Sequence, residues 1–198
     1  MADGNNDNDS STTSPGLGMK LTIAGIKKKF PSVKNISTEL LSTLMKSCLK
    51  SSSAVSEGNE KLLILDSRPN EEYIIGHIPG ARRVDYEADL DTLMSAVPEL
   101  QSAPEDKVTV VCYCSVGYRS SVVAQKISGY IKTKGLQESG NIKVFNLEGS
   151  IFKWANENRP MVDNKDRKTI FTHPYNVVFG KLLRKELRKT ALEEDSKI

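Results

Sequence analysis

The chain has few of the residues that cross-link small proteins or bind metals in them. Its 198 residues include only 3 cysteines and 2 histidines. An odd and small number of cysteines argues against a disulfide framework and for a reducing compartment, so we expect a cytoplasmic protein. No second pair of ligands accompanies Cys112 and Cys114 at the spacing of a closed zinc site, and we therefore expect no bound metal.

Long apolar runs and a strong net charge are also missing. No stretch of about 18 apolar residues occurs, and the N-terminus lacks a basic segment followed by an apolar one, so we expect neither a membrane span nor a signal peptide. The net charge is only +3, and the basic residues are scattered, which does not indicate nucleic-acid binding. The C-terminal Ser196-Lys197-Ile198 approaches the peroxisomal address Ser-Lys-Leu but differs at its last residue, which makes peroxisomal import a minor alternative.

The composition divides the chain into four parts. Residues 1–18 are mostly Asp, Asn, Ser, Thr and Gly, and they predict a disordered polar tail. Residues 19–32 predict a helical extension, with a helix at 21–30 that ends before Pro31. Residues 33–162 then form the main domain, and residues 163–198 a C-terminal helical extension.

Strands and helices alternate through the main domain. Apolar and β-branched runs predict strands at 33–36, 62–65, 81–84, 108–111 and 142–145. Helical periodicity predicts a helix capped by Ser37, a short one at 90–94, one from Ser120 onward, and one at 151–157 capped by Ser150. This order predicts an α/β fold, in which a mostly parallel sheet has helices on both faces. Ligands of such sheets bind at the carboxyl ends of the strands.

The C-terminal extension has the pattern of an amphipathic helix introduced by residues 173–175. Its apolar stripe consists of Val178, Leu182, Leu183 and Leu187, and its basic face of Lys181, Arg184, Lys185, Arg188 and Lys189. We expect this helix to pack on the domain with a solvated outer face. An acidic protein partner or a membrane surface on the basic face is the alternative.

The strongest functional signal is the segment from Cys114 to Arg119. It follows the predicted inner strand at 108–111 and precedes the predicted helix. Backbone N–H groups and the positive end of a helix converge at such a junction and favour an anion. A cysteine in this position should have a lowered pKa and be a good nucleophile at neutral pH.

Four motifs resemble those of the rhodanese-like sulfurtransferases over roughly residues 33–162. Residues 66–73 resemble the family's D-x-R-x-x-x-E-Y run, and residues 76–81 its G-H-I-P-G-A turn. Residues 146–149 with Trp154 resemble its L-E-G-G-x-x-x-W segment, although Ser150 replaces the second glycine. The segment from Cys114 to Arg119 lies where the catalytic loop of the family should be. The resemblance implies the three-layer rhodanese-like fold.

The resemblance also implies a mechanism. The Cys114 thiolate would attack the outer sulfur of an anionic donor such as thiosulfate and form a persulfide, from which a thiol or cyanide would take the sulfur. The loop residues Ser115, Val116, Gly117, Tyr118 and Arg119 would bind the substrate: their N–H groups would hold the persulfide, and the Arg119 guanidinium would attract the donor. No metal or organic cofactor is required.

Two alternatives remain. Related phosphatases and arsenate reductases have five residues between the cysteine and the arginine, whereas Cys114 and Arg119 enclose four, which favours sulfur transfer. A binding or regulatory module without turnover is the other alternative.

The remaining reactive or charged residues have simpler interpretations. Cys112 is interpreted as a core thiol, with a resolving redox partner of Cys114 as the alternative. His77 lies in a turn and is interpreted as structural. Asp66 and Arg68 are interpreted as charges that steady loops, with a direct substrate role as the alternative. Tyr118 either narrows the pocket or stacks on an acceptor.

Overall fold

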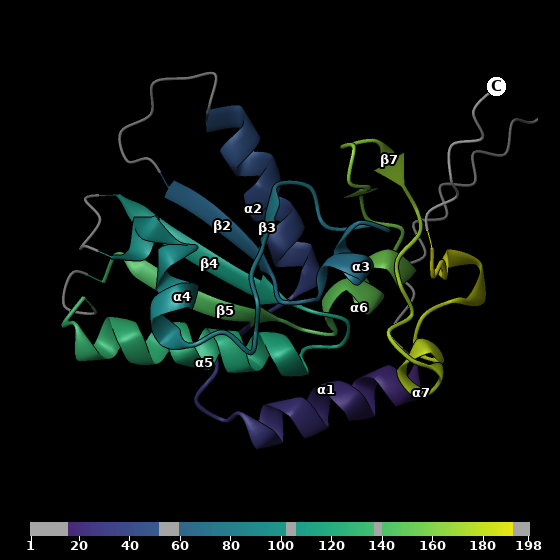
Figure 1. Ribbon diagram of the computed structural model, residues 1–198, viewed down its shortest axis with the longest axis horizontal. Helices are drawn as coiled ribbons and strands as arrows, with labels where there is room; N and C mark the ends of the chain where they lie inside the picture. The colour runs from purple at the N-terminus through teal and green to yellow at the C-terminus, as the bar shows by residue number, and fades with distance from the viewer. Residues whose placement is uncertain (1–15, 52–59, 102–105, 137–139, 192–198) are drawn as a thin grey trace, which may run out of the picture.

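The fold is organised around one parallel sheet (Figure 1). The computed structural model describes residues 16–51, 60–101, 106–136 and 140–191. Its five-stranded sheet has the order β1-β5-β4-β2-β3, and each neighbouring pair is parallel. The strands are β1 (Asn35–Ile36), β2 (Glu60–Asp66), β3 (Ala81–Arg83), β4 (Lys107–Tyr113) and β5 (Ile142–Leu147). The predicted α/β class and the five predicted strands are confirmed.

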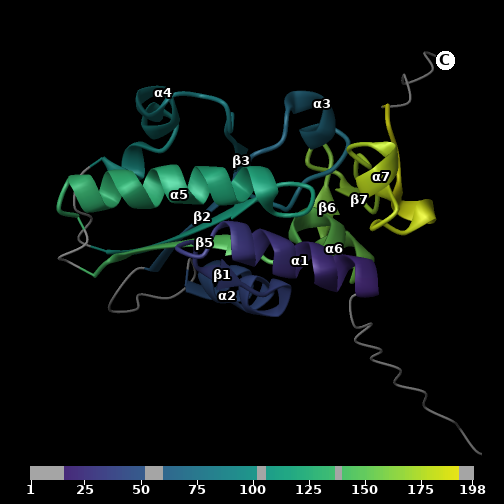
Figure 2. The ribbon, with the colours of Figure 1, turned by 90° about the horizontal axis from the view of Figure 1, so that it is seen from below.

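Helices cover both faces of the sheet, as Figure 2 shows. Helices α2 (Thr38–Ser51) and α6 (Ser150–Asn156) pack on one face, where Leu41 and Trp154 belong to one apolar cluster. Helices α4 (Leu90–Ser95) and α5 (Tyr118–Thr133) pack on the other face and contribute to the second cluster. The three-layer prediction is thus confirmed.

Helix α1 (Leu17–Lys29) lies against both layers. Met19, near its start, is buried in the cluster of α6, whereas Phe30, directly after its end, is buried in the cluster of α5. The helix begins four residues before the predicted start at Leu21. The Ser37 cap is confirmed, because the Leu40 N–H donates to its hydroxyl at 3.2 Å.

The sheet brings the ends of β2 and β4 together. Asp66 pairs in register with Tyr113, and the Ser67 N–H donates to the Tyr113 carbonyl at 2.8 Å. The loops that follow these two strands therefore meet at one edge of the sheet. The short helix α3 (Asn70–Tyr73) follows β2 at this edge.

The continuous C-terminal helix is a wrong prediction. The chain instead forms the antiparallel pair β6 (Met161–Val162) and β7 (Lys168–Thr169), the four-residue helix α7 (Val177–Gly180), and a 3-10 turn at Lys185–Leu187. The cause is tertiary hydrogen bonding that competes with the helix.

Several of these bonds cross the place where the helix was expected. The Asn156 side chain donates to the Leu182 carbonyl and accepts from the Arg184 N–H, at 2.8 and 2.9 Å. The Thr172 N–H donates to the Leu187 carbonyl at 2.9 Å. Leu183 and Leu187 are buried as expected, but Val178 is 72% exposed. Over residues 163–191 the predicted basic helical face for an acidic partner is therefore absent.

Two predictions fall on segments outside the described residues: most of the polar tail at 1–18 and the C-terminal tripeptide 196–198. Within the described part of the chain, no helix is long and apolar enough to cross a membrane.

Candidate active site

The segment from Cys114 to Gly117 connects β4 to α5, as predicted. Gly117 precedes the helix with φ +118°, a conformation that side chains disfavour. A Cβ there would also lie 3.3 Å from the amide nitrogen of Asn146. Glycine thus permits the tight turn that places Cys114 beside the start of the helix. Cys114 is only 1% exposed.

The surroundings of the Cys114 sulfur stabilise its thiolate. Burial alone would raise the pKa of this thiol, but the Arg119 charge and hydrogen bonds from Ser120 and Gly117 outweigh burial and lower the pKa below its ordinary value. The Gly117 N–H lies 3.1 Å from Sγ. Tyr118, Arg119 and Ser120 begin α5, and the N–H groups of a first helical turn have no partner within the helix. The sulfur therefore lies where backbone donors and a cation favour negative charge.

Arg119 forms a bidentate ion pair with Glu72, a residue of α3. The two N···O distances are 2.8 and 3.0 Å, and both side chains are buried. The Ser115 hydroxyl joins them, because it donates to Glu72 and accepts from Arg119, each at 2.8 Å. Glu72 thus holds Arg119 and the loop in place.

Glu72 has no predicted role, although it is the glutamate of the D-x-R-x-x-x-E-Y motif. The motif could have indicated its role. The other members of the motif lie at a strand end, and a glutamate that is buried there requires a cationic partner.

Helix α6 binds the opposite side of the loop. The Ile151 and Phe152 N–H groups donate to the carbonyls of Cys114 and Ser115, at 3.1 and 3.2 Å. The Ser150 hydroxyl accepts from the Cys114 N–H at 3.2 Å and donates to the Leu147 carbonyl. The prediction that Ser150 caps α6 is wrong. Ser150 is the first residue of the helix, its φ is +50°, and Gly149 occupies the cap position.

Cys112 lies in the apolar cluster beneath α5 and is fully buried. Burial, and to a smaller extent the charge of Cys114, raise the pKa of this thiol well above its ordinary value. A protonated thiol among apolar side chains is a poor nucleophile. This environment agrees with the interpretation of Cys112 as a core thiol.

Asp66 and Arg68 pair with each other in the core. The Arg68 guanidinium donates to the Asp66 carboxylate, to the Gly76 carbonyl at 2.8 Å and to the Thr172 hydroxyl at 3.0 Å. Arg68 therefore joins the loop after β2 to the C-terminal segment. Neither Asp66 nor Arg68 lines the cavity at Cys114, which agrees with a framework role for both.

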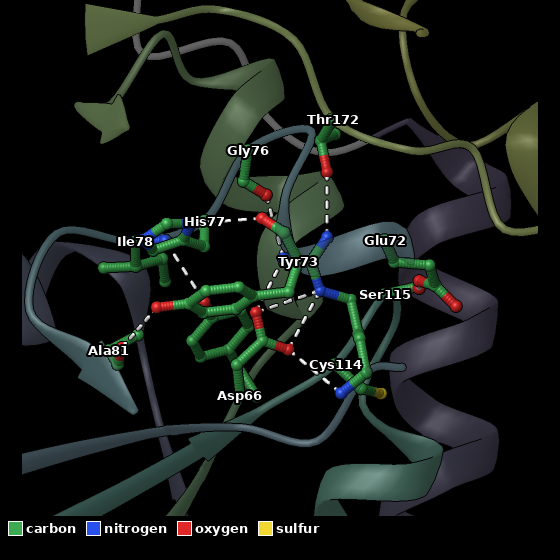
Figure 3. A network of polar contacts seen from close by, with 12 residues as sticks. Asp66, Glu72, Tyr73, Gly76, His77, Ile78, Ala81, Cys114, Ser115 and Thr172 are labelled. Atoms are coloured by element: carbon green, nitrogen blue, oxygen red, sulfur yellow. Dashed lines mark hydrogen bonds and ion pairs between the residues drawn. The ribbon is translucent and has the colours of Figure 1, made fainter. Parts of the chain in front are cut away.

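His77 also has structural contacts. Its ring stacks on Tyr73 with centroids 3.8 Å apart, and its Nδ1 lies 3.1 Å from the Tyr73 carbonyl, both visible in Figure 3. Its backbone pairs with Val162. Burial lowers the pKa of the ring, so the neutral form is favoured. His77 does not line the cavity at Cys114.

A cavity of about 470 Å³ opens over Cys114. Its floor consists of Cys114, Ser115, Val116 and Arg119, and Tyr118, which is 41% exposed, forms part of its wall. The remaining wall comes from α1 and from the segment that contains Tyr175 and Phe179. Neither contribution to the wall is predictable from the sequence, because neither segment has a chemical motif.

Among the residues that the structure describes, no three His, Cys, Asp or Glu side chains are grouped so that they could hold a metal ion.

Comparison with known proteins identifies the family. No curated protein matches the chain. Similar solved structures include thiosulfate sulfurtransferase from Pseudomonas aeruginosa, at 19% identity and a TM-score of 0.49, which covers 75% of this chain and 23% of that one. A yeast protein tyrosine phosphatase of the rhodanese family has 19% identity and a TM-score of 0.48, over 63% of this chain and 85% of its own. The BH2092 protein from Bacillus halodurans has 18% identity and a TM-score of 0.45, over 82% and 97%. The model of the rhodanese-like domain matches residues 52–157, more than half of the chain, and the protein therefore belongs to the rhodanese-like domain family.

Proposed function

We propose that the protein is a sulfurtransferase that holds a sulfane sulfur as a persulfide on Cys114. The observation that carries the proposal is the environment of this thiol: its pKa is lowered, and its sulfur lies at the start of α5 beside Arg119. The thiolate is the form of a cysteine that attacks a sulfur donor, and a lowered pKa increases its share at neutral pH.

The first half-reaction uses a small anionic donor such as thiosulfate. The Cys114 thiolate attacks the outer sulfur of thiosulfate, the S–S bond of the donor breaks, and sulfite leaves with the electron pair of that bond. The positive field of Arg119 and of the helix N-terminus favours the entry of the anion. The resulting persulfide carries one negative charge, as the thiolate did.

The second half-reaction returns the enzyme to its starting state. A thiol or cyanide attacks the outer sulfur of the persulfide, and Cys114 leaves as a thiolate. The N–H groups of Ser115 to Arg119 are suited to hold the terminal sulfur between the two steps, because a single sulfur atom needs only a short loop. The four residues between Cys114 and Arg119 therefore favour sulfur transfer over phosphoryl transfer.

Intact mass spectrometry tests the proposal. Incubation with thiosulfate should add the mass of one sulfur atom to the wild-type protein, and cyanide should then remove that sulfur as thiocyanate. Cys114→Ser should gain nothing, whereas the matched variant Cys112→Ala should gain and release sulfur as the wild type does.

Two results would overturn the proposal. A wild-type protein that stays unmodified with thiosulfate and with organic persulfides would be a binding module without turnover. Hydrolysis of a generic aryl phosphate that Cys114→Ser abolishes would identify a phosphatase.

A further inference from the structure

We propose that the cavity over Cys114 selects, as its sulfur acceptor, a small-molecule thiol attached to an aromatic or other flat apolar group. This inference rests on the proposed function and names the substrate class of its second half-reaction. The observations behind it are the shape and composition of the cavity wall. Cyanide or a small polar thiol would leave most of the cavity unfilled.

The wall facing the loop is one stripe of α1. Its members are Thr22, Gly25, Ile26 and Lys29, which lie on one helical face at spacings of three and four residues. Tyr175 and Phe179 also line the cavity, and the centroids of their rings are 5.9 Å apart. The volume of about 470 Å³ lies in the range of sites for organic ligands.

The two cations at the cavity are placed against aromatic rings. Lys29 Nζ lies 4.7 Å from the centroid of Tyr118, and the Arg119 guanidinium carbon lies 4.6 Å from that of Tyr175. Ion–ring contacts of this kind cover part of each charge with an apolar surface. The cavity therefore offers flat apolar walls to an acceptor while its floor retains the charge of Arg119.

These walls are additions to the matched domain. The family model covers residues 52–157, whereas α1 ends at Lys29 and the aromatic pair lies at 175 and 179. Figure 1 shows α1 and α7 near each other, outside the sheet. The acceptor preference is thus a property of this chain's own extensions.

The transfer step is balanced for such an acceptor. The acceptor enters as a thiol and gives its proton to the outer sulfur of the persulfide anion. The acceptor sulfur then attacks that outer sulfur, a new S–S bond forms, and the bond between Cys114 Sγ and the outer sulfur breaks. Cys114 leaves as a thiolate, the acceptor leaves as a persulfide that carries the proton of the original thiol, and no external oxidant or reductant is needed.

Gly25 allows a direct test. A Cβ at this position would meet no atom within 4 Å, and the residue lines the cavity, so Gly25→Phe places a ring where we expect the apolar group of the acceptor. Ala24→Phe adds nearly the same bulk at the preceding exposed position of the helix, which does not line the cavity. Thermal unfolding of both variants checks that they fold like the wild type.

The assay compares acceptors with thiosulfate as donor. In a two-step exchange, kcat/KM for the acceptor reports only the second half-reaction. We expect wild-type kcat/KM for 2-phenylethanethiol to exceed that for 2-mercaptoethanol, a thiol of similar reactivity, by about tenfold or more. Gly25→Phe should lower this ratio at least about fivefold, and Ala24→Phe should leave it unchanged.

The outcomes separate the two proposals. If the wild type forms no thiocyanate from thiosulfate and cyanide, the proposed function fails. If thiocyanate forms but the two thiols react equally well, or both phenylalanine variants change the ratio to the same extent, the acceptor inference is wrong and sulfur transfer stands.

Discussion

The buried pair formed by Glu72 and Arg119 should contribute strongly to the stability of the domain. The side chains are 3% and 10% exposed and are joined by two hydrogen bonds of 2.8 and 3.0 Å. Arg119→Met removes the cation and keeps most of the length of the side chain. Glu72 would then retain, of these partners, only the Ser115 hydroxyl at 2.8 Å.

The size of the effect follows from burial. Removal of one partner of a buried ion pair costs about 3–5 kcal/mol, because the other charge stays in a poor solvent. We therefore expect Arg119→Met to lower the free energy of unfolding by about 4 kcal/mol. In the double variant Glu72→Gln/Arg119→Met no charge is left unpaired. The decrease in the free energy of unfolding of the double variant should be smaller than the sum of the decreases in the two single variants by about 2 kcal/mol.

Urea unfolding at pH 7 measures the coupling energy between Glu72 and Arg119. Trp154 is the only tryptophan and is buried in the core, so its fluorescence reports the unfolding of the whole domain. The exposed pair of Arg82 with Glu99 supplies the control, because the Arg82 side chain is 43% exposed and Arg82→Met should cost less than about 1 kcal/mol. If the decrease in the free energy of unfolding of the double variant equals the sum of the two single decreases to within about 0.5 kcal/mol, the two residues are not coupled and the reasoning is refuted.

Three further predictions concern the thiols and the packing of the C-terminal segment. Because the pKa of Cys114 is lowered, its alkylation by iodoacetamide should stay fast at pH values where an ordinary thiol is protonated. The rate should fall only below the lowered pKa. A pH–rate profile like that of a peptide thiol would contradict this prediction. Cys112 should stay unmodified in the folded protein at pH 7, which peptide mass mapping after alkylation can check, and labelling there would exclude a core thiol. Gly76→Ala should lower the free energy of unfolding by about 1–3 kcal/mol, because a Cβ would lie 2.0 Å from the Phe171 carbonyl oxygen. Gly129→Ala, in open space on α5, should raise it by about 0.5–1 kcal/mol. If the melting temperatures of Gly76→Ala and the wild type are equal, the C-terminal segment can move away from Gly76.

The sheet could be predicted because its signal is local. Strands buried on both faces are nearly continuous apolar runs; 62–65 is such a run, and 108–111 is β-branched and apolar except for Thr109. Each became the centre of a longer strand, β2 and β4, whose ends also contain polar residues such as Glu60 and Lys107. The position of Cys114 followed from the same pattern, since a loop after an inner strand lies at the carboxyl edge of the sheet.

The C-terminal segment could not be predicted because its structure depends on distant partners. Its apolar spacing is helical, but an isolated helix of this length is marginal, and tertiary contacts decide its conformation. Asn156 binds the backbone at Leu182 and Arg184, and Arg68 binds Thr172. None of these pairings has a signal in the segment itself.

The cavity wall was missed for a related reason. The stripe of α1 that contains Gly25 and Ile26 has no reactive group, and helical spacing alone says nothing about what a helix packs against. Only the packing of α1 across the start of α5 turns this stripe into part of a site.

Helix α6 determines the direction in which the backbone N–H and carbonyl groups of the Cys114 loop point. A trans peptide group directs its carbonyl and the following N–H to opposite sides. The carbonyls of Cys114 and Ser115 accept hydrogen bonds from the first turn of α6, so the N–H groups of Ser115 and Val116 must face away from that helix. One helix N-terminus therefore binds the acceptors of the loop, while the other, at the start of α5, adds its donors beside the sulfur. An anion at Cys114 is favoured because two helices divide the polar groups of one short loop between them.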